Sequence, residues 1–409
     1  MIIEIYKISR RWAYLFLGTL SLLFAGFIYA WSILKTPYAV EFGWDPAQLA
    51  LNHTLTMVFV AVGNLSAGVL SKKVPYRILL ICSGVMISLG FFFSSRLSGE
   101  NVIALYLSYA CLCGTGIGVY LVTVMSVVGD WFPDLKGICS GTMQLGLGFS
   151  ALILGSLASY LIDMPNFGWR KTYLILALVI GVVMLLVAFL VKSPPLGTVL
   201  PAPKSSSQDQ SKYDSETLDI PSREMMKRRG FWQYYMFCLM VTGIGISMIS
   251  FATDYFLFMG ASSATAVLLT GLISVSNGLG RFFVGAIFDK AGCRTVMLFT
   301  TVISIASPVL LLASLPTNSI LLGAIGACLA GASFGCIPSS AGPIIRSSYG
   351  DSNFASNYSI VLTSSMPSSF VATIAGNILT KSGTYSMVFI ILFSMSIAAL
   401  VFCLSMKHP

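Results

Sequence analysis

The chain has 409 residues, of which 56% are hydrophobic and only 10% are charged, and its formal net charge is +9. Soluble domains contain about 45–50% apolar and about 25% charged residues, so this composition excludes an ordinary soluble fold. The positive charge does not indicate a nucleic-acid partner, because the lysines and arginines cluster between long apolar stretches.

Twelve apolar segments, each long enough to cross a hydrocarbon layer about 30 Å thick, follow one another along the chain. They cover residues 12–34, 47–70, 77–95, 101–129, 138–162, 171–191, 231–256, 264–288, 295–315, 318–346, 354–379 and 384–405. Residues rich in proline, serine and charge separate the sixth from the seventh, as in a solvated linker. We predict an all-α polytopic membrane protein with six-helix bundles over 1–192 and 231–409, joined by a cytoplasmic linker over 193–230.

Lysine and arginine are concentrated in alternate loops and in the linker. Because positively charged loops stay on the cytoplasmic side of a membrane, this bias predicts that both termini and the linker are cytoplasmic. We expect a multi-pass protein of the cell (plasma) membrane.

The two halves resemble each other at an offset of 217 residues, which pairs Gly68 with Gly285 and Asp134 with Asp351. Several charged positions in short predicted cytoplasmic loops also match. Such self-similarity is typical of duplicated halves and predicts two parallel repeats.

A gating motif follows the eighth span, where the chain reads Gly285-Ala-Ile-Phe-Asp289-Lys290-Ala-Gly292-Cys-Arg294. This sequence resembles the G-x-x-x-D-[RK]-x-G-x-R signature of the major facilitator superfamily. Charged groups in a tight turn can pair with each other and with helix ends, and so hold one conformation. The alternative is that these residues serve only as positive loop residues.

The first-half copy of this motif is degraded. It runs from Gly68 to Arg77, keeps Lys73, and has Lys72 where the acid would stand. We therefore expect an asymmetric latch.

Arg281 is the strongest candidate for a substrate ligand. It lies inside the eighth span, about 10 Å deep, where an arginine is costly unless it faces a cavity or a partner. Its guanidinium matches a carboxylate with two hydrogen bonds. Asn277 precedes it by one helical turn and can orient it or contact the substrate. The alternatives are snorkelling to the interface or a structural pair with a carbonyl.

Two tyrosines are further candidates for the substrate site. Tyr29 lies in the first span and Tyr120 follows the glycines of Gly-x-Gly-x-Gly in the fourth span, where helices can approach closely. Their hydroxyls can hydrogen-bond a carboxylate, although ordinary packing explains them as well.

His53, near the outer end of the second span, and Asp254, near the outer end of the seventh, are candidates for a proton-linked role. A satisfied helix-terminal histidine and a solvated acid are the alternatives. The nine cysteines show no C-x-x-C pair and no metal-ligand spacing, so we expect no metal and no cofactor.

Taken together, these pieces resemble the oxalate/formate antiporter family of the major facilitator superfamily, which is related to monocarboxylate transporters. The matching residues are Arg11-Trp12-x-Tyr14-Leu15, Tyr29-x-Trp31, Gly-x-Gly-x-Gly-x-Tyr120, Trp131-Phe132-Pro133-Asp134-x-Lys136-Gly137, Phe231-Trp232, Asn277-x-x-x-Arg281 and Asn357-Tyr358. The resemblance implies that Arg281 binds the substrate carboxylate with Tyr29 and Tyr120 nearby.

The resemblance also implies a difference from the oxalate carrier. That carrier's second cation, a lysine, falls at Ser365 here, and its tryptophan and tyrosine of the tenth helix fall at Ala330 and Phe334. One cation with a roomier, more apolar pocket favours a monocarboxylate over a dianion.

We therefore expect a monomeric secondary active transporter, not an enzyme, that works by alternating access in the lipid bilayer. Its partner is a small carboxylate, with protons in the case of symport or a second anion in the case of exchange. The alternatives are a dicarboxylate exchanger of the oxalate/formate type and a non-transporting membrane sensor of the same fold.

Overall fold

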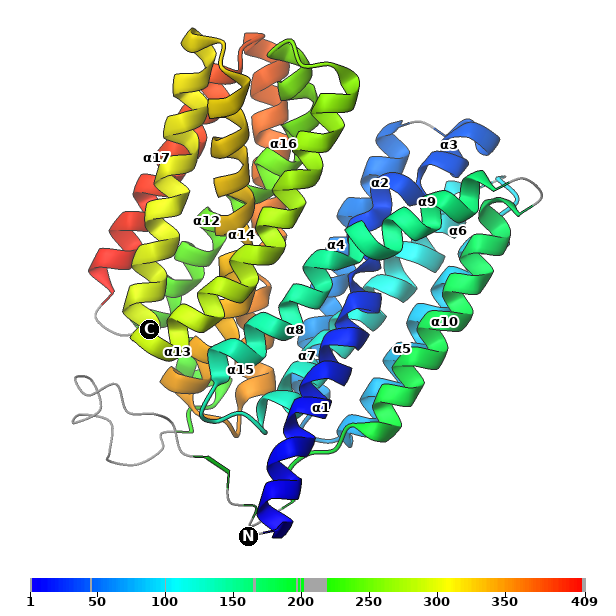
Figure 1. Cartoon of the computed structure of the whole chain (residues 1–409), viewed down its shortest axis with the longest axis vertical. Coiled ribbons are helices and arrows are strands. Elements are labelled where there is room, and N and C mark those ends of the chain that lie inside the picture. The colour runs from blue at the N-terminus through cyan, green and yellow to red at the C-terminus, as the bar shows by residue number, and fades with distance from the viewer. Residues whose placement is uncertain are drawn as a thin grey trace. The chain divides into compact units, whose positions relative to one another are not determined.

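The computed structural model describes residues 2–44, 46–99, 101–164, 167–195, 198, 200–201 and 219–406, and all regular structure within them is helical (Figure 1). Contacts within the chain divide it into two units. Unit 1 consists of Met1–Asp134, Phe149–Ala202 and Phe354–Ile360, and unit 2 of Leu135–Gly148, Pro203–Asn353 and Val361–Pro409.

These units exchange two short segments relative to the predicted bundles, residues 135–148 and 354–360. The division into bundles over 1–192 and 231–409 stays a prediction. Residues 196–197, 199 and 202–218 of the predicted linker lie outside the described residues.

Unit 1 is built from helices of the first half and one helix from late in the chain. Its helices are α1 (Ile2–Ala25), η1 (Gly26–Ala30), α2 (Trp31–Leu34), α3 (Thr36–Phe42), α4 (Pro46–Leu70), α5 (Tyr76–Ser95), α6 (Val102–Leu105), η2 (Tyr106–Cys113), α7 (Gly114–Gly129), η3 (Ala151–Gly155), α9 (Ser156–Asp163), α10 (Gly168–Leu190) and α15 (Phe354–Leu362). The element η1 is a 3₁₀-helix, whereas η2 and η3 are π-helices.

Unit 2 contains most of the remaining helices. They are α8 (Lys136–Ser150), α11 (Ser222–Met225), α12 (Arg229–Phe258), α13 (Ser263–Thr317), α14 (Ile320–Tyr349), α16 (Ser365–Ser382) and α17 (Tyr385–Ser405). Helix α8 ends at the boundary, with Phe149 and Ser150 assigned to unit 1.

Eleven helical stretches among the described residues are long and apolar enough to cross a membrane. The longest, Leu268–Thr317, contains Gly292, whose φ of 75° breaks the helix, so it comprises two spans. The resulting twelve agree with the predicted segments to within a few residues at most ends. Gly292 can take this left-handed conformation because it has no Cβ.

Irregularities within the spans were not predicted. The first span changes to a 3₁₀-helix at Gly26, the fourth and fifth contain the π-helices η2 and η3, and the eleventh divides between Leu362 and Ser365. Pro367 explains the division of the eleventh span, because it has no N–H to donate to Thr363 and its ring clashes with that carbonyl.

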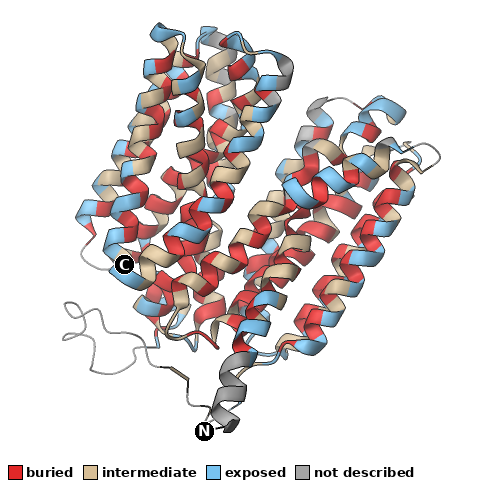
Figure 2. Cartoon of the chain, viewed as in Figure 1, coloured by how far each residue is buried: buried red, intermediate tan, exposed pale blue. Residues whose placement is uncertain are grey.

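In each unit the buried residues lie along helix faces that meet other helices, and the exposed ones lie along outer faces (Figure 2). Many exposed residues are large and apolar, for example Phe16, Leu178 and Val302 at 65–66% exposure. Outer faces of this kind fit helices surrounded by lipid, and they follow from the near-continuous apolar sequence of the spans.

Aromatic and apolar side chains form the cores. In unit 1, Tyr38 is fully buried, with its ring centroid 5.0 Å from that of Trp169 and 5.7 Å from that of Tyr173. In unit 2, Tyr255 and Phe389 pack with centroids 5.3 Å apart within a larger apolar cluster. Such pairs add about 0.5–1.5 kcal/mol each beyond simple burial.

Candidate functional site

Arg281 is almost completely buried in α13, with 1% of its surface exposed. Its Nε donates to Oδ1 of Asn277 at 3.3 Å, as the spacing of four residues predicts. Its Nη1 donates to Oε1 of Gln144 at 3.0 Å and approaches the main-chain oxygen of Gln144 at 3.4 Å. The three acceptors named here are uncharged oxygens.

Glycines allow α8 to approach α13 closely around this arginine. A Cβ added to Gly141 would lie 2.7 Å from the main-chain oxygen of Arg281, and one added to Gly148 would lie 2.8 Å from Cα of Gly278. A Cβ on Gly285 would overlap the main-chain oxygen of Gly137. Small residues therefore form this α8–α13 seam, as in close membrane-helix packing.

The carboxylate of Asp289 lies against the first turn of α8. The N–H groups of Gly137 and Ile138 each donate to one of its oxygens at 2.7 Å. A helix N-terminus carries partial positive charge and unpaired N–H groups, so an acid here stabilises the start of α8. The sequence predicted pairing with a helix end but not which helix.

The basic residues of the two predicted gating motifs are more exposed than Asp289 or have fewer described hydrogen bonds. Lys290 and Arg294 are exposed on α13, and Lys73 is exposed in the turn after α4. Arg77 is half-buried near the start of α5, and its Nε is buried without a hydrogen bond among the described residues. The gating role of all four stays a prediction.

Two other predicted substrate ligands lie in unit 2. Phe334 is half-buried on α14, where its Cβ faces Gly245, and the neighbouring Gly335 contacts Asn277. Ser365 is exposed at the start of α16, and its hydroxyl donates to the main-chain oxygen of Leu362. The contacts described for Ser365 do not connect it to Arg281.

The two predicted tyrosines lie in unit 1. Tyr29 is 36% exposed on η1. Tyr120 is fully buried on α7, and its hydroxyl makes no hydrogen bond among the described residues. Their roles stay predictions.

The candidates for a proton-linked role differ in their surroundings. His53 is half-buried on α4, and its Nδ1 is buried without a hydrogen bond among the described residues. Asp254 is exposed near the end of α12.

Several contacts were missed by sequence reasoning. Gln144 could have been noticed as an amide inside an uncharged span, but its partner is 137 residues away. In unit 1, Arg11 holds Asp134 through two hydrogen bonds of 2.7 and 3.1 Å. In unit 2, the repeat-related Asp351 pairs instead with Arg346 at 2.7 Å and lies 3.8 Å from Lys136.

The end of the linker is fixed to unit 2 by Asp219. This carboxylate accepts hydrogen bonds from the hydroxyl and the N–H of Ser352, which lies two residues before α15 begins. These bonds, the hydroxyl's first, lower the pKa of Asp219 below its usual value.

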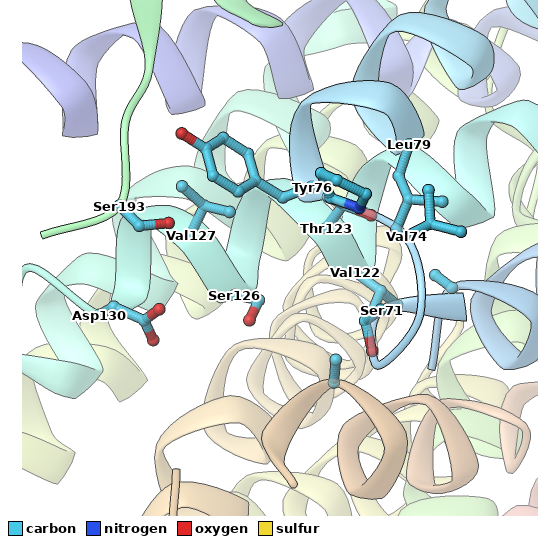
Figure 3. Close-up of a pocket in the computed structure, with 13 residues that line it drawn as sticks. Ser71, Val74, Tyr76, Leu79, Val122, Thr123, Ser126, Val127, Asp130 and Ser193 are labelled. Carbon is cyan, nitrogen blue, oxygen red and sulfur yellow. The ribbon is translucent and has the colours of Figure 1, made fainter. Parts of the chain in front are cut away.

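A cavity of about 320 Å³ opens in unit 1 beside the turn after α4 (Figure 3). Ser71, Thr123 and Asp130 are among its lining residues, but none of the predicted substrate ligands is. The hydroxyls of Ser71 and Thr123 donate to the main-chain oxygens of Gly68 and Val119. Because these groups are engaged internally, we do not assign the cavity as the substrate site.

The sequence model described as Major Facilitator Superfamily matches residues 15–260 and 235–409. The chain is 26% identical over 287 residues to the oxalate:formate antiporter of Oxalobacter formigenes, which covers 70% of this chain and 65% of the antiporter. The match thus spans slightly less than two thirds of that relative. Over 386 residues it is 23% identical to monocarboxylate transporter 2 of Mus musculus, covering 89% and 78% of the two chains.

Among solved structures, the proton:xylose symporter XylE superposes with a TM-score of 0.77 at 14% identity, covering 98% of this chain and 96% of that one. This likeness confirms the predicted fold class, and the relatives are transporters, not enzymes. The resemblance found in the sequence is confirmed at modest identity.

Proposed function

The chain belongs to the Major Facilitator Superfamily, and on that premise we propose that it carries small organic anions, above all monocarboxylates, by alternating access. The observation that supports this most is the buried Arg281 in a membrane-spanning helix. A charge in such a place is costly and marks a functional site by default.

The chemistry of Arg281 favours a carboxylate. Its planar guanidinium offers parallel N–H donors that fit two carboxylate oxygens, and it keeps its charge at any physiological pH. Relatives named for oxalate, formate and monocarboxylates support an anionic substrate. Asn277 would hold the guanidinium in place through its bond to Nε.

Selectivity for one carboxylate is supported by the residues where the oxalate carrier has polar or charged groups. Ser365 offers no charge for a second carboxylate, and Ala330 and Phe334 carry apolar side chains. A single negative charge would neutralise Arg281, whereas a dianion would leave a buried negative charge without compensation. We propose Tyr29 and Tyr120 as further ligands from unit 1.

We propose that the α8–α13 seam is the latch of the transport cycle. Asp289 stabilises the start of α8, and Gly285 lets the helices approach. Separation of this seam would break both contacts, so they set the free-energy difference between two states. The exposed Lys290 and Arg294 would contribute as weaker partners in the same turn, and we propose Lys73 and Arg77 as gating residues of the first-half turn.

The protein spans the membrane many times, and we propose that it lies in the plasma membrane with both termini in the cytoplasm. The support is the concentration of lysine and arginine in alternate loops. We propose that it acts as a monomer, with no nucleic-acid partner.

Coupling is either proton symport, in which His53 or Asp254 would take part, or anion exchange. Uptake into proteoliposomes with an inwardly directed proton gradient and no internal substrate separates them. Symport predicts accumulation under these conditions, whereas exchange requires an internal anion.

Counterflow in proteoliposomes tests the substrate class. We expect saturable exchange of labelled L-lactate or pyruvate and weak exchange of oxalate. Arg281→Gln should lower monocarboxylate exchange by about 100-fold or more, because the buried partner of the carboxylate is lost. Arg223→Gln, which removes an exposed arginine of α11, is the matched control and should exchange normally.

Preference for oxalate would reject monocarboxylate selectivity. Full transport by Arg281→Gln would reject the role of Arg281. Binding without any counterflow would favour a non-transporting sensor of the same fold.

A further inference from the structure

Gln144 occupies a special position in the α8–α13 seam. It follows Gly141 by three residues and precedes Gly148 by four, so all three lie on one face of α8. Both glycines contact the backbone of α13, and a Cβ on Gly148 would also lie 3.8 Å from Cδ of Arg281. Gln144 therefore extends a long polar side chain into the seam at the level of the guanidinium, between two glycines.

Burial strengthens the hydrogen bond between Gln144 and Arg281. Gln144 and Arg281 are each only 1% exposed, and 3.0 Å separates Oε1 from Nη1. In a surrounding of low polarity such a bond to a charged donor is stronger than in water. It helps to satisfy a charge that would otherwise be costly to bury.

We propose that Gln144 is a displaceable ligand of Arg281. Its amide oxygen holds the guanidinium until substrate binds, and the substrate carboxylate then replaces that oxygen at Nη1. This inference rests on the proposed function and adds a specificity-determining residue to it. Gln144 is a positioning residue, because it acts through Arg281.

An amide at position 144 suits this role because its oxygen and the substrate carboxylate compete for the same donor, Nη1 of Arg281. The amide oxygen of Gln144 carries no charge, whereas a carboxylate adds the attraction of its negative charge to the bond and can take two hydrogen bonds from one guanidinium. A substrate carboxylate can therefore replace an amide oxygen. A glutamate at position 144 would be tethered beside Arg281, would form the ion pair itself, and would exclude the substrate.

The side chain at position 144 thus sets how strongly the protein competes with the substrate carboxylate for the guanidinium of Arg281. An apolar side chain of the same length removes the competitor, a carboxylate makes it permanent, and the amide lies between them. Substitutions in the two directions should change affinity with opposite signs, which general damage to the helix contact would not produce.

The experiment measures dissociation constants of L-lactate, pyruvate and oxalate by calorimetry on the purified full chain. We expect Gln144→Met, which is nearly isosteric, to lower the constant for monocarboxylates about fivefold, because the competing bond is lost. We expect Gln144→Glu to raise it by about 100-fold or more. The same two substitutions at Gln233, a glutamine of α12 bound to Ser405, are matched controls and should change nothing.

Parent-like binding by Gln144→Glu, or weaker binding by Gln144→Met, would overturn the inference. If Gln144→Glu does not fold, as thermal unfolding would reveal, Gln144→Met alone decides. Suppose that the parent binds monocarboxylates and Arg281→Gln binds none. If both variants at position 144 then bind as the parent does, only this inference fails and the proposed function stands. If the folded parent binds none of the three anions, the proposed function and this inference fail together.

Discussion

Two turns lie 217 residues apart in the sequence, residues 68–77 between α4 and α5 and residues 285–294 inside α13. Each begins with a glycine that contacts the start of another helix of its own unit, α15 for Gly68 and α8 for Gly285. These two helices begin at nearly the same offset, at Phe354 and Lys136.

The chemistry of the two contacts differs. At α13, Gly285 meets a main-chain oxygen, and the Asp289 carboxylate binds two N–H groups of α8. At α4, the hydroxyl of Ser356 donates to the main-chain oxygen of Gly68, and Lys72 replaces the acid. One contact combines charge with a helix terminus, whereas the other uses a neutral hydrogen bond.

The two repeats therefore keep the same close backbone contact but differ in the charge that accompanies it. A carboxylate at a helix N-terminus is stabilising, while a lysine in the corresponding turn has the wrong sign for that role. We therefore expect the α13 turn to contribute more stability than the α4–α5 turn, and substitutions can test this expectation.

The largest expected effect comes from Gly285→Ala. The new Cβ would overlap the main-chain oxygen of Gly137, so the two helix backbones must separate. We expect a loss of about 2 kcal/mol or more in the free energy of unfolding, as for other overpacked contacts. Thermal unfolding of the purified protein measures it, with exchange in proteoliposomes as a second readout.

Gly68→Ala is the matched comparison. Its Cβ would meet the hydroxyl of Ser359, which can rotate away, and would lie 3.0 Å from Cα of Ser356. We expect a loss below about 1 kcal/mol. Equal losses at the two glycines would contradict the proposed asymmetry.

Asp289→Asn should have the next largest effect. Asparagine keeps one acceptor oxygen but loses the charge and one of the two bonds to α8. We expect a loss of about 1–2 kcal/mol, measured by thermal unfolding at low salt, where the helix-terminus interaction is least screened. Lys72→Gln, which removes the charge of the other turn, should change the midpoint little. A larger effect of Lys72→Gln would reverse the assignment of the stronger turn.

The sequence predicted this fold well because the dominant signal in a membrane protein is local. The charged turn separates the predicted segments 264–288 and 295–315, and the structure places the break at Gly292 within that turn. The division of the eleventh span depends on Pro367, and a single proline changes the average hydropathy of the segment 354–379 too little to mark a break. The sequence thus specified span positions better than their internal breaks.

The site was predictable only where its contacts are local. Asn277 and Arg281 are one turn apart on one helix, so their hydrogen bond could be inferred. Gln144 is distant in sequence from Arg281, and the start of α8 is distant from Asp289. Nothing in a single sequence indicates that these residues pair. Glycine spacing on α8 was the available clue, since Gly137, Gly141 and Gly148 lie on one face, but glycine is common throughout this chain.

The smallest expected effect concerns a carboxylate that is held in a loop. Asp219 accepts hydrogen bonds from the N–H and the hydroxyl of Ser352 in the same unit, whereas Asp289 binds the N–H groups of a helix terminus. Because the folded pKa of Asp219 is lowered, its contribution to stability is present near neutral pH and is lost as pH falls through that lowered pKa.

Because Asp219 is exposed, solvent screening keeps the effect small. Asp219→Asn should lower the unfolding midpoint by about 1–2 °C at pH 7. At a pH low enough to protonate Asp219, the parent and the variant should unfold together. A difference that persists at low pH would mean that the amide disturbs the loop around Ser352 by its shape, and that the charge of Asp219 is not what stabilises this loop.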